Sequence, residues 1–263
     1  MSSSSPWTGP AIPAPPEPDP YDIEYRAEDP PWNGWDVLRI GIMMFVVPYL
    51  LIPVSAIVAQ RLFYRGLPWV TVAEKPWVAL STQFAWYAVV AAYMVMFVET
   101  TFGQRFWSSI RWNWPGSRWP ALVPVGVVLV SLQGLERFFK IPKHIPMEEF
   151  LRTPFAAGLT GIFAVSFGPL MEELFFRGFL YPVIARRFGI VVGVLATSVA
   201  FGMIHAAQLA FAWGLVLIVF LVGIVLTVVR ARTGSVGSSF VVHVTYNATL
   251  VVIGLVASRQ FTR

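Results

Sequence analysis

Long apolar runs, separated by short polar connections, constrain the fold of this chain more than any other feature of its sequence. A helix needs about 20 apolar residues to cross the hydrocarbon core of a bilayer, and runs of that order follow one another from Val37 onwards. The sequence therefore predicts an all-α fold, a polytopic transmembrane helix bundle with about seven to eight spans. We expect the membrane helices at residues 37–59, 77–98, 119–135, 155–184, 189–209, 210–230 and 238–257.

Two of these runs depart from the length of a single crossing. Residues 119–135 are short for a full span, whereas residues 155–184 are longer than one span requires. Within the long run, Gly168 and Pro169 predict a break or kink, because proline removes a backbone hydrogen bond and clashes with the preceding turn.

The composition indicates a multi-pass integral protein of a cell membrane. Hydrophobic residues make up 56% of the chain and charged residues 13%, about half the charged share of an average soluble domain. The absence of cysteine excludes a thiolate nucleophile, a thiolate metal site and disulfides. The formal net charge is +5, but no basic cluster is long enough to follow a phosphate backbone. We therefore expect the lipid bilayer, and no nucleic acid, as a partner; the basic residues divide too evenly to set the orientation.

The chain before the first apolar run is different in kind. Residues 1–35 contain nine prolines and a series of acidic residues, a mix that buries too little apolar surface to offset the entropy of ordering. We expect 1–35 to be a disordered proline-rich tail and 36–154 to form N-terminal membrane helices without a motif. At the end of that segment, His144 lies near Glu148 and Glu149. We expect a solvated loop there, because flanking prolines prevent a helix.

Three charged residues interrupt the fourth apolar run. Glu172, Glu173 and Arg177 lie within residues 155–184, and ionisable groups at membrane depth are costly and mark functional sites. On a helix, Glu173 and Arg177 stand at positions i and i+4 and can pair, while Glu172 is rotated by about 100°. Arg177 can therefore neutralise Glu173 and leave Glu172 free for chemistry.

Two histidines lie in the runs that follow. His205 stands four residues after Phe201, and Asn247 stands four residues after His243. Residues four apart share a helix face, so His243 and Asn247 can point into one cavity. A single intramembrane histidine is often a hydrogen-bonded packing residue, but the set on consecutive helical runs indicates a site.

Other intramembrane protease chemistries are less well matched. The sequence lacks the His-Glu-x-x-His pattern of a zinc protease helix. An aspartyl pair is excluded, since no aspartate follows Asp36. A serine enzyme stays open at this point, because Ser235, Ser238 and Ser239 precede His243 in the chain.

The motifs together resemble one known family. A Glu-Glu-x-x-x-Arg block begins at Glu172, a Phe-x-x-x-His block ends at His205, and a His-x-x-x-Asn block begins at His243. This order is similar to that of the CAAX protease and bacteriocin-processing family of intramembrane proteases. The resemblance covers roughly residues 155–257, and it implies that residues 155–263 form a catalytic membrane core with a polar cavity between helices. It implies an endopeptidase of the CAAX prenyl protease-like, type II kind, classed by family as a metalloendopeptidase, acting on peptides or proteins at the membrane, prenylated or not.

The chemistry of amide hydrolysis agrees with that implication. Glu172 can act as the general base that activates a water molecule, and His205 can position that water or pass its proton to the leaving amine. His243 and Asn247 can donate hydrogen bonds to the developing oxyanion. We favour this metal-free scheme.

The same side chains admit a metal-dependent scheme. Glu172, His205 and His243 can bind zinc as a two-histidine, one-carboxylate site with water in the fourth position. Zinc would then polarise the carbonyl and activate the water. The sequence leaves the cofactor open.

Two other classes of function use the same residues. One is a non-catalytic immunity or scaffold protein that binds a peptide or a membrane partner in the cavity. The other is a small-molecule or ion transporter, against which the lack of an internal repeat counts.

With the expected boundaries, Glu172, His205 and His243 do not fall at one depth. They can meet only if the fourth helix is broken or the fifth continues past His205.

Overall fold

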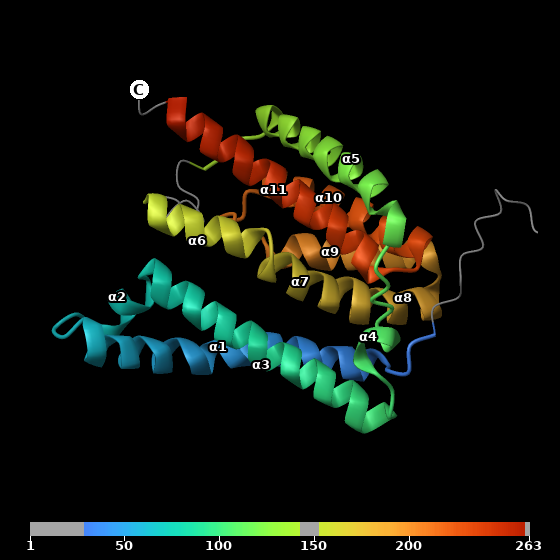
Figure 1. Cartoon of the computed structure of the whole chain (residues 1–263), viewed down its shortest axis with the longest axis horizontal. Coiled ribbons are helices and arrows are strands. Elements are labelled where there is room, and N and C mark those ends of the chain that lie inside the picture. The colour runs from blue at the N-terminus through green and yellow to red at the C-terminus, as the bar shows by residue number, and fades with distance from the viewer. Residues whose placement is uncertain (1–28, 143–152, 261–263) are drawn as a thin grey trace, which may run out of the picture.

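The computed structural model describes residues 29–142 and 153–260, and every secondary-structure element within them is helical (Figure 1). The predicted all-α membrane bundle is confirmed. Six described helices or helical runs are long and apolar enough to cross a membrane. They are Gly34–Phe63, Pro76–Phe102, Gly116–Phe138, Pro154–Phe188, Trp213–Thr233 and Val236–Ala257.

The fifth expected span, residues 189–209, is shorter than predicted. Its helix α9 (Ile190–Ile204) has 15 residues, a length of about 22 Å. The chain then turns, with Ala210 and Phe211 at φ 50° and 55°, backbone values that cannot continue a right-handed helix. The span count is therefore six among the described residues, with α9 as a shorter apolar helix beside them.

The N-terminal half of the bundle is a helical hairpin. Helices α1 (Gly34–Phe63) and α3 (Pro76–Phe102) are joined through the short α2 (Trp69–Ala73). A capping box at Asn33 starts α1, and the left-handed Gly103 ends α3. One face of this hairpin packs against the helical run that carries the acidic motif.

The segment just before α1 is bound to the bundle. Trp32 is fully buried, and its Nε1 donates a hydrogen bond to the carbonyl oxygen of Phe179 at 3.2 Å. The guanidinium of Arg186 donates to the carbonyls of Pro30 at 2.7 Å and Trp32 at 3.0 Å. The expected tail boundary at residue 35 is therefore wrong, because these contacts hold the chain from Asp29 onwards. Residues 1–28 lie outside the described residues, as does the loop with His144, Glu148 and Glu149.

The fourth span is broken, as expected, but at another place. Helix α6 (Pro154–Ala164) ends before Ser166, and α7 (Phe167–Glu173), a π-helix η4 (Leu174–Leu180) and α8 (Tyr181–Phe188) follow in one run. Pro169 lies in the first turn of α7, where its missing N–H has no intrahelical partner to lose. The break therefore precedes the Gly-Pro pair instead of falling on it.

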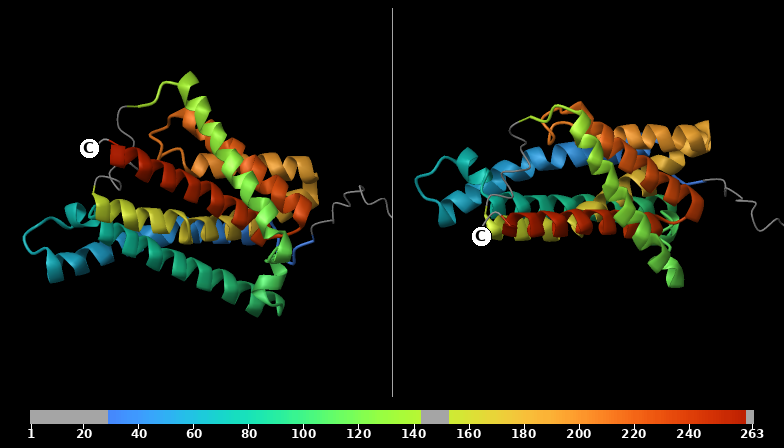
Figure 2. Two further views of the ribbon diagram at one scale, coloured as in Figure 1. Left: turned by 45° about the horizontal axis from the view of Figure 1, so that its top comes forward. Right: turned by 90° about the horizontal axis from the view of Figure 1, so that it is seen from above.

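The remaining helices form the other wall of the bundle. They are α4 (Phe106–Ser109), η1 (Gly116–Arg118), α5 (Trp119–Leu129), which continues as the 3₁₀-helix η2 (Val130–Phe138), then α9, α10 (Trp213–Thr233) and α11 (Val236–Gln260). Figure 2 shows α5 crossing obliquely over α10 and α11. At this crossing a Cβ on Gly126 would lie 2.7 Å from the carbonyl oxygen of Val242. Glycine thus permits the close approach of α5 and α11, as is usual between membrane helices.

Candidate active site

A cavity of about 780 Å³ lies between the N-terminal hairpin and the C-terminal helices. Helices α1, α2, α3, η2, α6, α7, α10 and α11 contribute to its lining, together with the end of α9 and the turn after it. Four of the six residues singled out in the sequence line it: Glu172, His205, His243 and Asn247. Most of the remaining lining is apolar. This is the kind of space in which polar groups act strongly, because little water competes with them.

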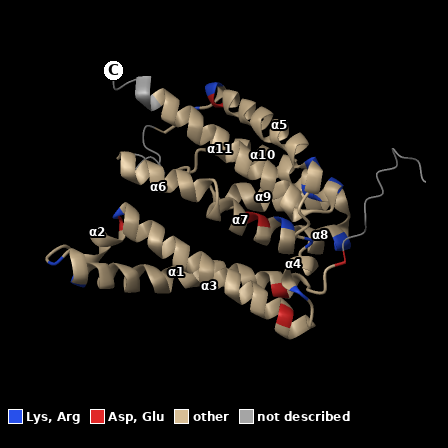
Figure 3. Cartoon of the chain, viewed as in Figure 1, with Lys and Arg blue, Asp and Glu red and all other residues tan. Residues whose placement is uncertain are grey.

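Glu173 lies behind this cavity and is completely buried. Its Oε1 lies 3.0 Å from NH1 of Arg177 and 2.9 Å from Nδ1 of His243. Its Oε2 accepts a hydrogen bond from the hydroxyl of Ser239. The expected pairing of Glu173 with Arg177 is present, and α11 adds two further partners that the sequence did not indicate. Figure 3 shows the acidic and basic positions next to each other along the run of α7 and η4.

The guanidinium of Arg177 connects η4 to α10. Its Nε donates to the hydroxyl of Thr227 at 3.3 Å, and its NH2 donates to the carbonyl of Gly223 at 3.1 Å. The group also lies 4.6 Å from the ring centre of Phe201, on α9. A buried cation is tolerated only when its donors are paired, and here three helices supply the partners of Arg177.

Glu172 lies close to His205 and His243 in the lining of the cavity. Its Oε1 is 3.7 Å from Nε2 of His205, and its Oε2 is 3.6 Å from Nε2 of His243. Both separations exceed a direct hydrogen bond. The three side chains meet because the fourth span is broken, and α7 starts as a new helix after the end of α6. This is the first of the two conditions expected from the sequence. The second condition is not met, because α9 ends before His205.

The hydrogen bonds of the two histidines define their ring orientation. Nδ1 of His205 lies 2.7 Å from the carbonyl oxygen of Phe201, and Nδ1 of His243 lies 2.9 Å from the carboxylate of Glu173. A carbonyl and a carboxylate only accept, so each Nδ1 carries the hydrogen. Each Nε2 then faces Glu172 and, in the neutral ring, presents a lone pair.

Asn247 has a structural contact of its own. Its Nδ2 donates a hydrogen bond at 2.7 Å to the carbonyl of Ala164, the last residue of α6. This bond satisfies a carbonyl at the helix end, which has no partner within its helix. Asn247 therefore connects α11 to the break in the fourth span while it also lines the cavity.

The serine alternative does not match the structure. The hydroxyl of Ser235 bonds to the carbonyl of Asn113, and that of Ser239 bonds to Glu173. Ser235, Ser238 and Ser239 are buried, and none of them lines the cavity. A nucleophile must reach a substrate carbonyl, so these serines support the fold and are not placed for catalysis.

The zinc alternative was tested on the donor groups. Zinc accepts carboxylate and imidazole ligands such as Glu172, His205 and His243. The Nδ1 of each histidine also bonds to a carbonyl or carboxylate oxygen, as is usual for histidines that bind a metal through their other nitrogen. Within the described part of the chain, however, no group of three or more His, Asp or Glu side chains is arranged so that it could hold a metal ion. The proposed reaction therefore uses the protein's own side chains, and metal removal tests the zinc alternative.

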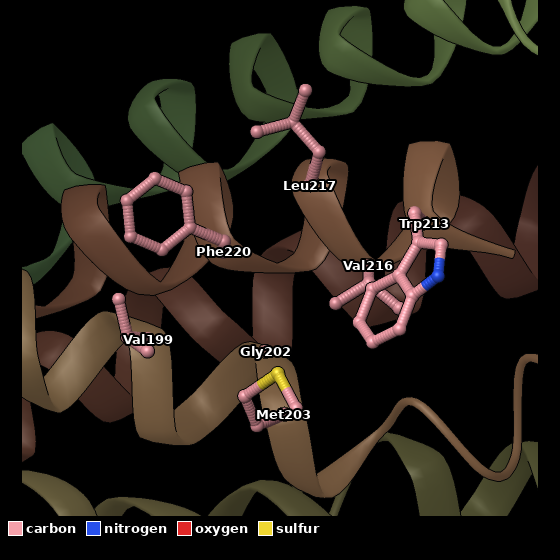
Figure 4. Close-up of a pocket in the computed structure, with 7 residues that line it drawn as sticks. All are labelled: Val199, Gly202, Met203, Trp213, Val216, Leu217 and Phe220. Carbon is pink, nitrogen blue, oxygen red and sulfur yellow. The ribbon is translucent and has the colours of Figure 1, made fainter. Parts of the chain in front are cut away.

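A second, smaller hollow lies on the other side of the wall formed by α9 and α10. It has a volume of about 260 Å³ and apolar side chains only, among them Met203, Trp213 and Phe220 (Figure 4). Gly202 lines this hollow, whereas the adjacent Phe201 lines the cavity. Apart from the indole N–H of Trp213, the lining has no hydrogen-bonding side chain and no acid or base, so the hollow offers an apolar contact surface and no catalytic group.

Comparison with known proteins finds a similarity in the C-terminal part of the chain. Residues 154–249 match the family model Rce1-like, described as type II CAAX prenyl endopeptidase Rce1-like. No curated protein and no solved structure matches the chain. The matched segment begins with α6, ends within α11 and contains all six site residues, while α1 to η2 lie outside it. The chain is thus a multi-pass membrane protein whose segment 154–249 is similar to the Rce1-like family of type II CAAX prenyl endopeptidases.

Proposed function

We propose that the protein is an intramembrane endopeptidase that hydrolyses peptide bonds of membrane-associated peptides or proteins, with Glu172 as the general base. The observation that carries this proposal is the meeting of Glu172 with Nε2 of His205 and Nε2 of His243 in a cavity between membrane-spanning helices. The match to a family described as endopeptidases supports the reaction class. A prenylated CAAX-type substrate is the candidate that the family description suggests.

Glu172 would act on a water molecule. A general base needs to lie within hydrogen-bond reach of the proton that it accepts, directly or through one water. The separations of 3.6 and 3.7 Å between Glu172 and the two Nε2 atoms leave a water within reach of the carboxylate and of either ring. Glu172 takes one proton from this water, whose oxygen attacks the scissile carbonyl carbon. That proton then passes to the leaving nitrogen as the C–N bond breaks, with His205 placed to relay it.

His243 would stabilise the negative oxygen of the tetrahedral intermediate. Because its Nδ1 already donates to Glu173, Nε2 can donate a second hydrogen bond only when the ring is protonated. Asn247 keeps one of its two amide hydrogens for the substrate, since the other is bound to Ala164. These donors correspond to an oxyanion hole.

The test is peptide cleavage by wild type and Glu172→Gln. Glutamine keeps the shape of glutamate and removes the base, so we expect cleavage to fall by at least about 100- to 10,000-fold. Mass-spectrometric profiling of peptides from membranes that contain either variant measures the loss and identifies the product. Glu74→Gln, at an exposed position outside the cavity, is the matched control. Identical peptide profiles for wild type and Glu172→Gln would contradict catalysis and favour the scaffold or transport alternatives.

A further inference from the structure

A second carboxylate, that of Glu136, lines the same cavity as Glu172. It belongs to η2, which lies outside the family-matched segment. Among the described residues of the lining, Glu136 and Glu172 are the only acidic side chains, and no lysine or arginine is present. A peptide that enters this cavity therefore meets negative charge at two places, and only one of them belongs to the proposed reaction.

The carboxylate of Glu136 has no counterion in the described part of the chain. Glu136 is half-buried, and no ion pair or hydrogen bond with another described residue engages its side chain. The adjacent Arg137 does not line the cavity, and its guanidinium lies over the ring of Phe138 at 4.8 Å. A charge that is partly withdrawn from water is stabilised by an opposite charge brought close to it.

Hydrogen-bonding groups extend from Glu136 toward the catalytic residues. Gln133 lies one 3₁₀ turn before Glu136, so the two side chains lie on one face of η2. Nε2 of Gln133 donates to the hydroxyl of Tyr246 at 2.6 Å, which leaves the Oε1 of Gln133 as an acceptor. A carboxylate and an amide oxygen on one face suit a group with several N–H donors, such as an ammonium or a guanidinium.

The position of this pair relative to the reaction centre follows from helix geometry. Tyr246 stands three residues after His243 on α11, a rise of about 4.5 Å, and one 3₁₀ turn separates Gln133 from Glu136 by about 6 Å. An extended peptide advances about 3.3 Å per residue. Glu136 also lies near the end of the candidate span Gly116–Phe138, at a depth where long basic side chains of membrane-bound peptides reach polar surroundings.

We propose that Glu136 and Gln133 form a substrate subsite for a lysine or arginine side chain, about three or four residues from the cleaved bond. The subsite rests on the proposed endopeptidase function and narrows its substrate class to peptides with a basic residue at that distance. The ion pair forms in a cavity partly shielded from water, where attraction between charges is stronger than at an exposed surface.

Cleavage of matched peptides tests the subsite. The full-length protein in nanodiscs is given quenched fluorescent peptides that differ only by lysine or norleucine at one position, scanned about two to five residues on either side of the cleaved bond. We expect kcat/KM to be about tenfold higher for the lysine peptide than for the norleucine peptide at one position. A tenfold difference corresponds to ~1.4 kcal/mol from the ion pair. Glu136→Gln should lower kcat/KM for the lysine peptide to that for the norleucine peptide and so abolish this preference, whereas the control Arg137→Gln should keep it. Equal rates for both peptides in wild type, or a preference retained in Glu136→Gln, would overturn the subsite.

Binding to a variant that lacks the base decides the question without catalysis. Fluorescence anisotropy with Glu172→Gln protein should give about tenfold tighter binding of the lysine peptide, and adding Glu136→Gln should equalise the two affinities. If wild type cleaves neither peptide but the binding preference is present, the subsite stands and the endopeptidase proposal fails. Equal affinities in the Glu172→Gln protein overturn the subsite, whatever the cleavage result.

Discussion

The carboxylate of Glu173 accepts a hydrogen bond from Nδ1 of His243 over 2.9 Å, although the two residues are separated by 70 positions in the chain. Glu173 is also paired with Arg177, so one buried carboxylate joins the ion pair within its own helical run to a histidine of α11. Both side chains are buried. The contact sets which nitrogen of His243 faces the cavity, and it gives Glu173 a positioning role distinct from that proposed for Glu172.

Glu173→Gln should reduce cleavage through His243 while Glu172 stays intact. The amide can present either its oxygen or its nitrogen to Nδ1, so the tautomer and the orientation of the ring are no longer fixed. We therefore expect kcat to fall by about 100-fold or more with KM little changed. Steady-state kinetics in detergent measures both constants. Ser239→Ala is the matched control, because it removes only the hydroxyl that contacts the other oxygen of Glu173. A kcat of Glu173→Gln close to that of wild type would refute the positioning role.

Arg177→Lys should destabilise the protein and impair cleavage although the charge is kept. The guanidinium spreads its donors over Glu173, Thr227 and Gly223. A single ammonium cannot reach all three groups, and each buried acceptor left unpaired costs about 1–3 kcal/mol. Thermal unfolding in detergent measures the loss. The control Arg187→Lys, in the last turn of α8, should unfold at the wild-type temperature. An unchanged unfolding temperature for Arg177→Lys would show that the three contacts of Arg177 do not stabilise the protein.

Trp32→Phe should lower stability by about 1 kcal/mol, because it keeps an aromatic ring and removes the hydrogen bond to the carbonyl of Phe179. Trp35→Phe is the matched control, since that side chain is 74% exposed.

Deleting residues 2–28, which leaves Trp32 in place, should preserve peptidase activity. Unfolding midpoints and cleavage rates measured side by side test both statements. A deletion that abolishes cleavage of a short soluble peptide would assign the tail to the active enzyme.

Removal of metal should leave cleavage intact. Metal content per protein, measured after extensive chelation, is compared with the rate of peptide cleavage by the same sample. In the metal-free scheme His243→Gln retains a hydrogen-bond donor, and we expect a loss of about 100- to 1000-fold with measurable residual activity. In the zinc scheme the same substitution removes a metal ligand and should leave almost no activity. Activity that vanishes with zinc and returns when zinc is added would refute the metal-free scheme.

Much of the fold could be read from the sequence, because membranes impose local rules. A span requires a long apolar run and a helix that satisfies its own backbone hydrogen bonds, so most span positions were predictable. The pairing of Glu173 with Arg177 was also predictable, since it depends only on helix spacing. The shortening of α9 was not, because the turn at Ala210 and Phe211 follows an apolar stretch that reads as helix.

The tertiary structure alone decided which distant groups meet. The contacts of Trp32 with Phe179, of Glu173 with His243 and of Asn247 with Ala164 each join segments at least 70 residues apart. Their geometry depends on how whole helices pack, a property that no local spacing encodes. The break in the fourth span lies before Ser166 for the same reason, since Asn247 on another helix satisfies the carbonyl at the end of α6. The sequence thus determined the helices and the candidate residues, and packing decided the depth, orientation and partners of each side chain.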